Sequence, residues 1–108
     1  MSRLPAAAIL WLALAGAAAA QPATGEAVFQ KWCAPCHGAG PGHPGTDALR
    51  AKYHDAKPAE LLARRDLTAD QVRFYVRHGV SIMPFFRKTE ISDPELDALG
   101  AYLSRSAR

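Results

Sequence analysis

The stretch Lys31–Gly40, KWCAPCHGAG, holds both cysteines of this chain, and a histidine follows the second cysteine directly. Cys33 and Cys36 lie three residues apart, and His37 is the next residue. Such a pair can form a disulfide, supply half of a zinc site, act as a redox dithiol or anchor a porphyrin. The rest of the sequence distinguishes these four chemistries.

The residues before this stretch have the composition of an export signal. A positively charged start, Met1–Arg3, precedes the apolar run Leu4–Ala20, which ends in small residues. This order predicts a signal peptide over residues 1–20, cleaved after Ala20, and hence a periplasmic protein. A membrane anchor is the alternative, but an alanine-rich run of this length is short for a bilayer span. We expect no membrane span after cleavage.

Residues 21–108 are expected to form a single domain. A chain of this length buries a small core and usually gains stability from a metal, disulfides or a cofactor. A disulfide between Cys33 and Cys36 would close a very short loop and would therefore add little. The 13 basic and 10 acidic residues are interspersed, without a basic stripe beside aromatic residues. This pattern excludes nucleic-acid binding.

The hydrophobic pattern is helical throughout, with neither strand alternation nor a hairpin signal, and it predicts an all-α fold. Two capping boxes, Thr68 with Gln71 and Ser92 with Glu95, mark the starts of two helices, and Gly79 is a stop for the first of them. Further helices are expected over residues 25–33 and 58–62. By contrast, the glycines and prolines within residues 38–57 predict an irregular loop that wraps around another group.

The spacing of apolar residues also predicts which side chains face the core. On the helix after Thr68, Arg73 and Arg77 are expected on the outer face. The side chains expected to point inward on the last two helices are Val72, Tyr75, Val76, Leu96, Leu99, Tyr102 and Leu103.

The pattern Cys33-x-x-Cys36-His37 is typical of c-type haem attachment. Two thiols at i and i+3 can form thioethers with the two vinyl groups on one side of a porphyrin, and the imidazole that follows is brought beneath the iron. A thioredoxin-like dithiol needs a strand–helix–strand setting, and tetrahedral zinc needs ligands that no second cysteine pair supplies. The sequence therefore predicts one covalently bound haem c, with His37 as an axial iron ligand.

Met83, in GVSIMPFF, is the expected second axial ligand, because it is the only methionine of residues 21–108. It follows the predicted helix stop, and Pro84 favours an extended backbone at Met83. Thioether ligation stabilises ferrous iron and leaves no open position for small gases. The alternatives are a methionine that only packs and ligation by one of three histidines, His43, His54 or His78.

Neighbouring residues have predicted supporting roles. Phe85 and Phe86 are expected to pack in the core and to shield the methionine side of the ring. The second ring N–H of His37 is expected to donate to a backbone carbonyl, which fixes the orientation of the imidazole. Pro41 and Pro44 are the two candidates for that carbonyl.

With these motifs, the chain resembles the class I cytochromes c over nearly all of residues 25–103. Gly25 and Phe29 lie four residues apart near the start, and Leu99 and Tyr102 lie three apart on the last predicted helix. In that family, such positions form the crossing of the first and last helices, where a glycine lets the two backbones approach. The resemblance implies a small fold of about four to five helices around one haem.

Two longer stretches, CHGAGPGHPGTDAL and RHGVSIMPFFRKTEISDPELDALGAYL, resemble the cytochrome subunits of p-cresol methylhydroxylase-type flavocytochromes. This implies one-electron transfer from a flavoprotein subunit that oxidises a 4-alkylphenol such as p-cresol, and onward to a small copper protein or another cytochrome. No residue is assigned an acid, base or nucleophile role, so the chain is expected to be an electron-transfer protein and not itself an enzyme.

Two alternatives remain at this point. The first is a freely diffusing cytochrome that shuttles electrons between complexes, and the second is a thiol–disulfide protein that uses Cys33 and Cys36.

Overall fold

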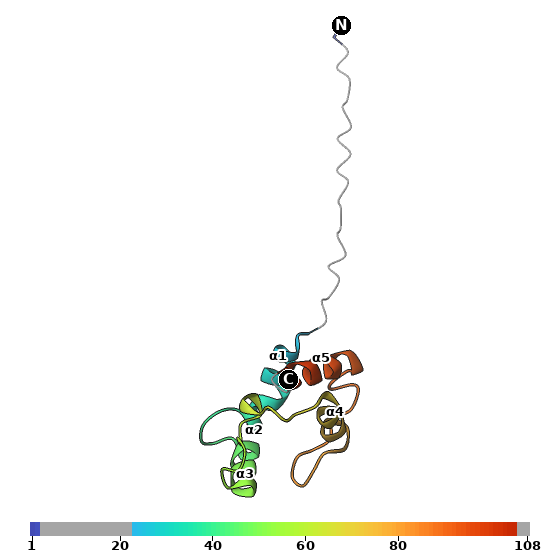
Figure 1. The fold of residues 1–108 in the computed structure, drawn as a ribbon. Helices are drawn as coiled ribbons and strands as arrows, with labels where there is room; N and C mark the ends of the chain where they lie inside the picture. Colours follow the sequence, from blue (N-terminus) through green and yellow to red (C-terminus); the bar gives the residue numbers. More distant parts are fainter. Residues whose placement is uncertain (3–22, 106–108) are drawn as a thin grey trace.

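The computed structural model describes residues 1–2 and 23–105, and this part of the chain is all-α, as predicted (Figure 1). Apart from helices it contains an isolated bridge between Val80 and Met83. The predicted signal peptide, residues 1–20, falls almost wholly outside the described residues. The elements are α1 (Gly25–Val28), η1 (Phe29–Cys33), α2 (Ala34–His37), α3 (Pro44–Tyr53), η2 (Leu61–Ala63), α4 (Ala69–His78) and α5 (Asp93–Ser104).

The first helix runs unbroken through α1, η1 and α2, so it ends at His37 and not at the predicted Cys33. The hydroxyl of Thr24 caps its start. Its middle element, η1, is a π-turn, and Pro35 follows in the first turn of α2, where a residue without an N–H is tolerated. Because the wide π-turn shifts the hydrogen-bonding pattern ahead of the proline, the helix continues. Both cysteines and His37 therefore belong to one rigid element.

Helix α1 crosses α5 at a glycine. A Cβ atom on Gly25 would lie 2.5 Å from the Cβ of Tyr102, and it would come closer still to the carbonyl oxygen of Ala98. The ring of Phe29 packs against that of Tyr102 with a centroid distance of 6.1 Å. The predicted crossing of the first and last helices is therefore confirmed, and it requires glycine at position 25.

The core lies where the first helix and α4 pack against α5 (Figure 1). The predicted inward positions of α4 and α5 are confirmed except for Tyr75, which keeps 43% of its surface exposed. Tyr75 lies about 60° around the helix from the stripe formed by Val72 and Val76, so it flanks the buried face. The buried apolar residues are Val28, Phe29, Val72, Val76, Ile91, Leu96, Leu99 and Leu103.

Helices α4 and α5 begin where their capping boxes predict. The Thr68 hydroxyl accepts a hydrogen bond from the Gln71 N–H, and the Gln71 side chain accepts one from the Thr68 N–H. Ser92 and Glu95 form the same reciprocal pair. Gly79 ends α4 with a φ of 70°, a conformation that favours glycine. These local signals are strong enough to set both helices.

Residues 38–57 are not the irregular loop that their glycines and prolines predict, because Pro44–Tyr53 form helix α3. Pro44 stands in the first turn, where its fixed φ suits a helix and its missing N–H costs nothing. His54 ends α3 in the left-handed conformation, with a φ of 46°. The helix predicted over residues 58–62 is also wrong, since Glu60 is extended and only the short 3-10 turn η2 follows.

A buried arginine fixes the chain between η2 and α4. Arg64 keeps 7% of its surface exposed, and its Nη2 donates to Asp66 at 2.7 Å. Its Nη1 donates to the Tyr53 hydroxyl at 3.4 Å, and Lys57 donates to Asp66 at 3.3 Å. The hydrogen bond from Arg64 holds the pKa of Asp66 well below its usual range. This cluster connects the end of α3 to the segment that leads into α4.

The glycine at the helix crossing gives a first testable prediction. Gly25→Ala should lower the free energy of unfolding by about 3 kcal/mol, because the added Cβ collides with the backbone of α5. Urea unfolding followed by circular dichroism measures the change. Gly100→Ala is the matched control: its Cβ meets Ala69 Cβ at 3.2 Å, and the helix-propensity gain of about 1 kcal/mol offsets the crowding. Equal losses in both variants would contradict the prediction.

Candidate functional site

The two cysteines and His37 lie on consecutive turns of the first helix, between the end of η1 and the end of α2. Residues three apart on a helix rise by about 4.5 Å and share a face, so both sulfurs are available to one side of a flat ring. Cys33 is partly buried and Cys36 is exposed, and the two thiols are not joined in a disulfide. This arrangement fits the predicted double thioether attachment.

The chemistry of the thiols disfavours the thiol–disulfide alternative. Burial raises the pKa of the Cys33 thiol to about 11, and the neighbouring Cys36 adds to the rise. Reactive cysteines of redox proteins need a lowered pKa, because the thiolate is the nucleophile. In residues 1–2 and 23–105, no group of three or more His, Cys, Asp and Glu side chains is placed to hold a metal ion. A protein-only zinc site is therefore not supported in this region.

The surroundings of His37 favour a neutral imidazole. Burial lowers its pKa, and a neutral imidazole has the lone pair that an iron ligand needs. Its Nδ1 atom is buried and, within the described residues, has no hydrogen-bond partner. A Cβ atom on Gly45 would lie 2.7 Å from His37 Cε1 and 2.9 Å from Nδ1. The backbone at Gly45 therefore forms a wall against this ring.

The predicted backbone carbonyl for His37 is wrong in this structure, since neither Pro41 nor Pro44 accepts from Nδ1. For Pro44 the reason is helix α3. Because α3 begins at Pro44, the Pro44 carbonyl points along the helix axis. The segment is instead tied by Thr46, a buried residue at the start of α3 whose hydroxyl donates to the Gly38 carbonyl at 2.7 Å. The roles of Gly45 and Thr46 could not be predicted from the sequence, because they depend on helix α3, which the sequence pattern does not predict.

The three histidines named as alternative ligands are engaged elsewhere or exposed. The ring of His43 folds back on its own loop, with Nδ1 3.2 Å from the Gly40 carbonyl oxygen. His54 is exposed at the end of α3. His78 is exposed, stacks on Phe74 with a centroid distance of 4.4 Å, and has Nδ1 2.8 Å from the Phe74 carbonyl oxygen.

Met83 lies on a tight turn just after α4. Val80 and Met83 exchange two backbone hydrogen bonds of 3.1 and 2.9 Å. A Cβ atom on Gly79 would lie 2.6 Å from the Met83 carbonyl oxygen, so the turn packs directly on the glycine that ends α4. Met83 itself is partly buried. Its backbone is therefore held in a defined position, which suits a ligand better than a free loop would.

An aromatic contact joins the two halves of the candidate site. The rings of Trp32 and Phe86 meet edge-to-face with a centroid distance of 5.8 Å. Trp32 precedes Cys33, and Phe86 lies three residues after Met83. This contact brings the cysteine-bearing helix and the methionine-bearing segment together. Phe86 packs against the core as predicted, whereas Phe85 keeps 59% of its surface exposed, so the prediction that it is a core residue is wrong.

Apolar side chains with exposed surface gather in sequence around Met83. Val80 and Ile82 precede it and Phe85 follows it, with exposed fractions of 50%, 81% and 59%. Exposed apolar side chains that lie close together in the chain are a candidate binding surface. Two unpaired thiols, a partly buried imidazole and this apolar surface are together what a covalently bound porphyrin needs. The residues present therefore fit haem c.

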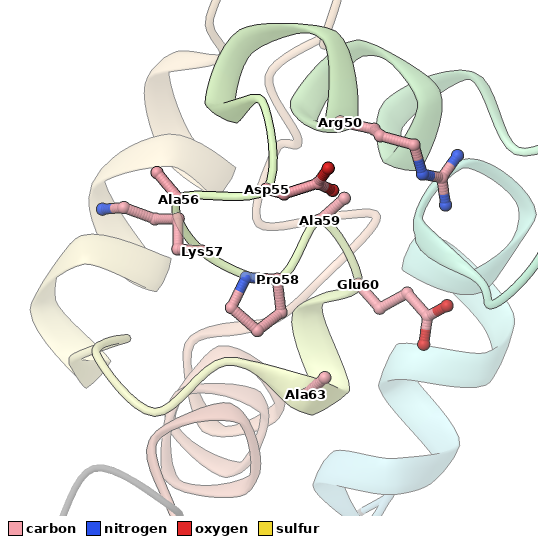
Figure 2. A pocket seen from close by; sticks show the side chains of 8 residues that line it. All are labelled: Arg50, Asp55, Ala56, Lys57, Pro58, Ala59, Glu60 and Ala63. Carbon is pink, nitrogen blue, oxygen red and sulfur yellow. The ribbon is translucent and has the colours of Figure 1, made fainter.

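A surface hollow lies elsewhere. It has a volume of about 390 Å³ and is lined by Arg50, residues 55–60 and Ala63. Figure 2 shows the charged ends of Arg50 and Lys57 pointing to opposite sides, so they do not converge on one ligand. Neither cysteine, His37 nor Met83 lines it. This hollow is therefore not the candidate functional site.

Comparison with known proteins identifies a family that the chain matches. Residues 20–103 match the model of the family described as "Cytochrome C oxidase, cbb3-type, subunit III". No curated protein matches the chain. In the part of the chain that the structure describes, no helix has the length and hydrophobicity needed to cross a membrane.

The wall at Gly45 gives a second testable prediction. Gly45→Ala should displace the His37 ring, because the added Cβ would lie well inside contact distance of it. We expect a loss of about 1–3 kcal/mol in unfolding free energy, together with a changed reduction potential.

Gly40→Ala is the control for Gly45→Ala. Its Cβ has no neighbour within 4 Å, and its positive φ of 83° costs only local strain of about 1–2 kcal/mol. The reduction potential of the Gly40 variant should match the wild type. Unchanged potentials in both variants would show that Gly45 does not position the imidazole.

Proposed function

Because the chain belongs to the family described as cytochrome c oxidase, cbb3-type, subunit III, we propose that it is a single-haem electron carrier with iron held between His37 and Met83. Membership of this family makes the chain a class I c-type cytochrome with covalently bound haem c. The observation that carries the axial assignment is the Trp32–Phe86 contact. It joins the helix that ends in His37, whose Nδ1 is buried, to the turn that presents Met83.

Each residue of the site has a separate task in this proposal. Cys33 and Cys36 tether the ring to the first helix, so that the cofactor cannot dissociate. His37, whose ring lies against the backbone at Gly45, supplies a nitrogen ligand. Met83 supplies a soft sulfur ligand, which favours the ferrous state and raises the reduction potential. The bound haem supplies reversible one-electron chemistry at its iron.

The apolar residues next to Met83 complete the site. Val80 and Ile82 expose apolar surface just before the methionine. Such surface excludes water from the ligand side of the ring and keeps its surroundings of low polarity, which tunes the potential. Electron transfer needs no acid, base or nucleophile, and none is assigned. The chain is an electron-transfer protein, although a member of this family can be part of a larger oxidase complex.

For the electron donor, we propose a flavoprotein subunit that oxidises a 4-alkylphenol such as p-cresol. This rests on the resemblance of residues 36–49 and 77–103 to flavocytochrome subunits. The segment after Met83 is suited to docking, because Phe85 is exposed and is followed by Arg87 and Lys88, which are also largely exposed. A small copper protein or another cytochrome would accept the electron. We further propose export by the signal peptide of residues 1–20 and a periplasmic location.

The family description favours a second candidate. In it, the chain delivers electrons within or toward a terminal oxidase, as the words "cytochrome C oxidase" and "subunit III" suggest. A freely diffusing shuttle is a variant of this candidate. Both keep the same haem site and differ from the first only in the protein that the exposed surface meets.

Removal of the sulfur ligand tests the axial assignment. Met83→Ala should bind carbon monoxide rapidly in the ferrous state, because one iron position becomes open. Its reduction potential should fall by on the order of 0.1 V. Stopped-flow absorbance and a redox titration measure the two effects. His43→Ala and His78→Ala are the controls and should behave like the wild type. Rapid carbon monoxide binding by the wild type would contradict the assignment to Met83.

Isolation of the native assembly tests the partner. Under gentle conditions the cytochrome should co-elute from gel filtration with a flavin-containing polypeptide. Co-elution with oxidase subunits would support the second candidate, and migration alone would support a shuttle; either would contradict the flavoprotein proposal.

A matched pair of variants locates the docking surface. Phe85→Ala should weaken the association with the flavoprotein about tenfold, as expected for an apolar anchor. Phe74→Ala removes an equally exposed phenylalanine from the outer face of α4, with 56% exposure against 59%. It should leave the affinity unchanged. Equal affinities for both variants would place the interface elsewhere.

A further inference from the structure

The segment that carries Met83 is fixed at both ends. We define the methionine loop as residues 79–86. Its near end is the turn closed by the two hydrogen bonds between Val80 and Met83, packed on Gly79. Its far end is Phe86, whose N–H donates to the Val76 carbonyl of α4 at 2.7 Å. The loop therefore leaves α4 and returns to it within a few residues.

One side chain completes the closure of this loop. Arg77, in the last turn of α4, donates from Nη1 to the Phe86 carbonyl at 3.1 Å. Its Nη2 donates to Asp93 Oδ1 at 2.8 Å, at the start of α5. The side chain is 20% exposed, which makes these contacts less accessible to water than an ordinary surface ion pair. Lys88 donates to the other oxygen of Asp93 at 3.1 Å.

Arg77 thus links three parts of the chain: α4, the methionine loop and α5. Both backbone polar groups of Phe86 are engaged, one by Val76 and one by Arg77. The ring of Phe86 is held in turn by Trp32, which belongs to the cysteine-bearing helix. If Phe86 could move, Met83, three residues earlier, would move with it. The distance between the Met83 sulfur and the haem would then change.

Arg73 lies one helical turn before Arg77 and offers an internal comparison. Its guanidinium donates to Asp97 of α5 at 3.0 Å and to Asp70 of α4 at 2.8 Å. Like Arg77, it ties α4 to α5 by ion pairs. Its hydrogen bonds in the described chain go to these two carboxylates and not to the methionine loop. It is also more exposed, at 42%.

We propose that Arg77 is a positioning residue for the Met83 ligand: it clamps the methionine loop at Phe86 so that the sulfur stays on the iron. This inference rests on the proposed His37 and Met83 ligation. The hydrogen bond from a charged donor to the Phe86 carbonyl closes the loop, and Asp93 orients the donor. The clamp lowers the population of molecules in which the sulfur is detached, without touching the cofactor itself.

The test compares Arg77→Met with Arg73→Met in the haem-loaded protein. Two measurements are made: the far-red charge-transfer absorption of ferric haem bound to a thioether, and the rate of carbon monoxide binding to the ferrous form. In Arg77→Met, carbon monoxide should bind about tenfold faster than in the wild type, because loss of one charged hydrogen bond raises the detached population by that order. Arg73→Met should stay within about twofold of the wild type.

Urea titrations separate a local effect from a general loss of stability. In Arg77→Met, the far-red absorption should disappear at a lower urea concentration than the helical circular dichroism, because the loop opens first. In Arg73→Met, the two transitions should coincide. Arg77→Lys, which keeps a cation beside Asp93, should fall between Arg77→Met and the wild type. The lysine variant also serves if Arg77→Met does not fold.

The outcomes distinguish this inference from the proposed function. A wild type without the far-red absorption overturns ligation by Met83 itself. A wild type with that absorption, combined with equal behaviour of the Arg77 and Arg73 variants, overturns the clamp alone. Faster carbon monoxide binding confined to the Arg77 variants supports it.

Discussion

Helix α5 is the support on which both halves of the site depend. The first helix, which ends in Cys33, Cys36 and His37, packs on α5 at Gly25, and α4, which leads into the Met83 turn, packs on α5 at Gly100. At both crossings, the absence of a side chain lets the backbones approach closely. In Figure 1, α3 and the segment after α4 both extend downward from the α1–α5 pair, α3 at the left and the segment at the right. A shift of either helix on α5 would move one ligand relative to the other.

Features that depend on residues close together in the chain could be predicted from the sequence. The two capping boxes and the glycine that ends α4 depend on contacts within a few residues, and the structure agrees with each. The crossing at Gly25 was also predictable, because a known family places a glycine at that point. The position of Met83 outside a helix follows from Gly79 before it and Pro84 after it.

Features that depend on competition between signals could not be predicted in the same way. In the sequence pattern, the helix-breaking residues between Gly38 and Pro44 hide the helix-forming residues that follow them. Only the structure shows that Pro44 starts a helix. The unpartnered Nδ1 of His37 and the wall at Gly45 are consequences of that helix. For Arg77, the sequence predicted only a place on the outer face of its helix. Its hydrogen bond to the Phe86 carbonyl could not be predicted, because it depends on the path of the turn between them.

The proposed site requires that iron be bonded to one imidazole nitrogen and one sulfur from the same chain. Iron-edge X-ray absorption of the purified ferrous protein measures this most directly, because sulfur and nitrogen scatter differently and lie at different distances from the metal. We expect one sulfur atom bonded to iron in the wild type and none in Met83→Ala. A spectrum with only nitrogen and oxygen ligands in the wild type would contradict it.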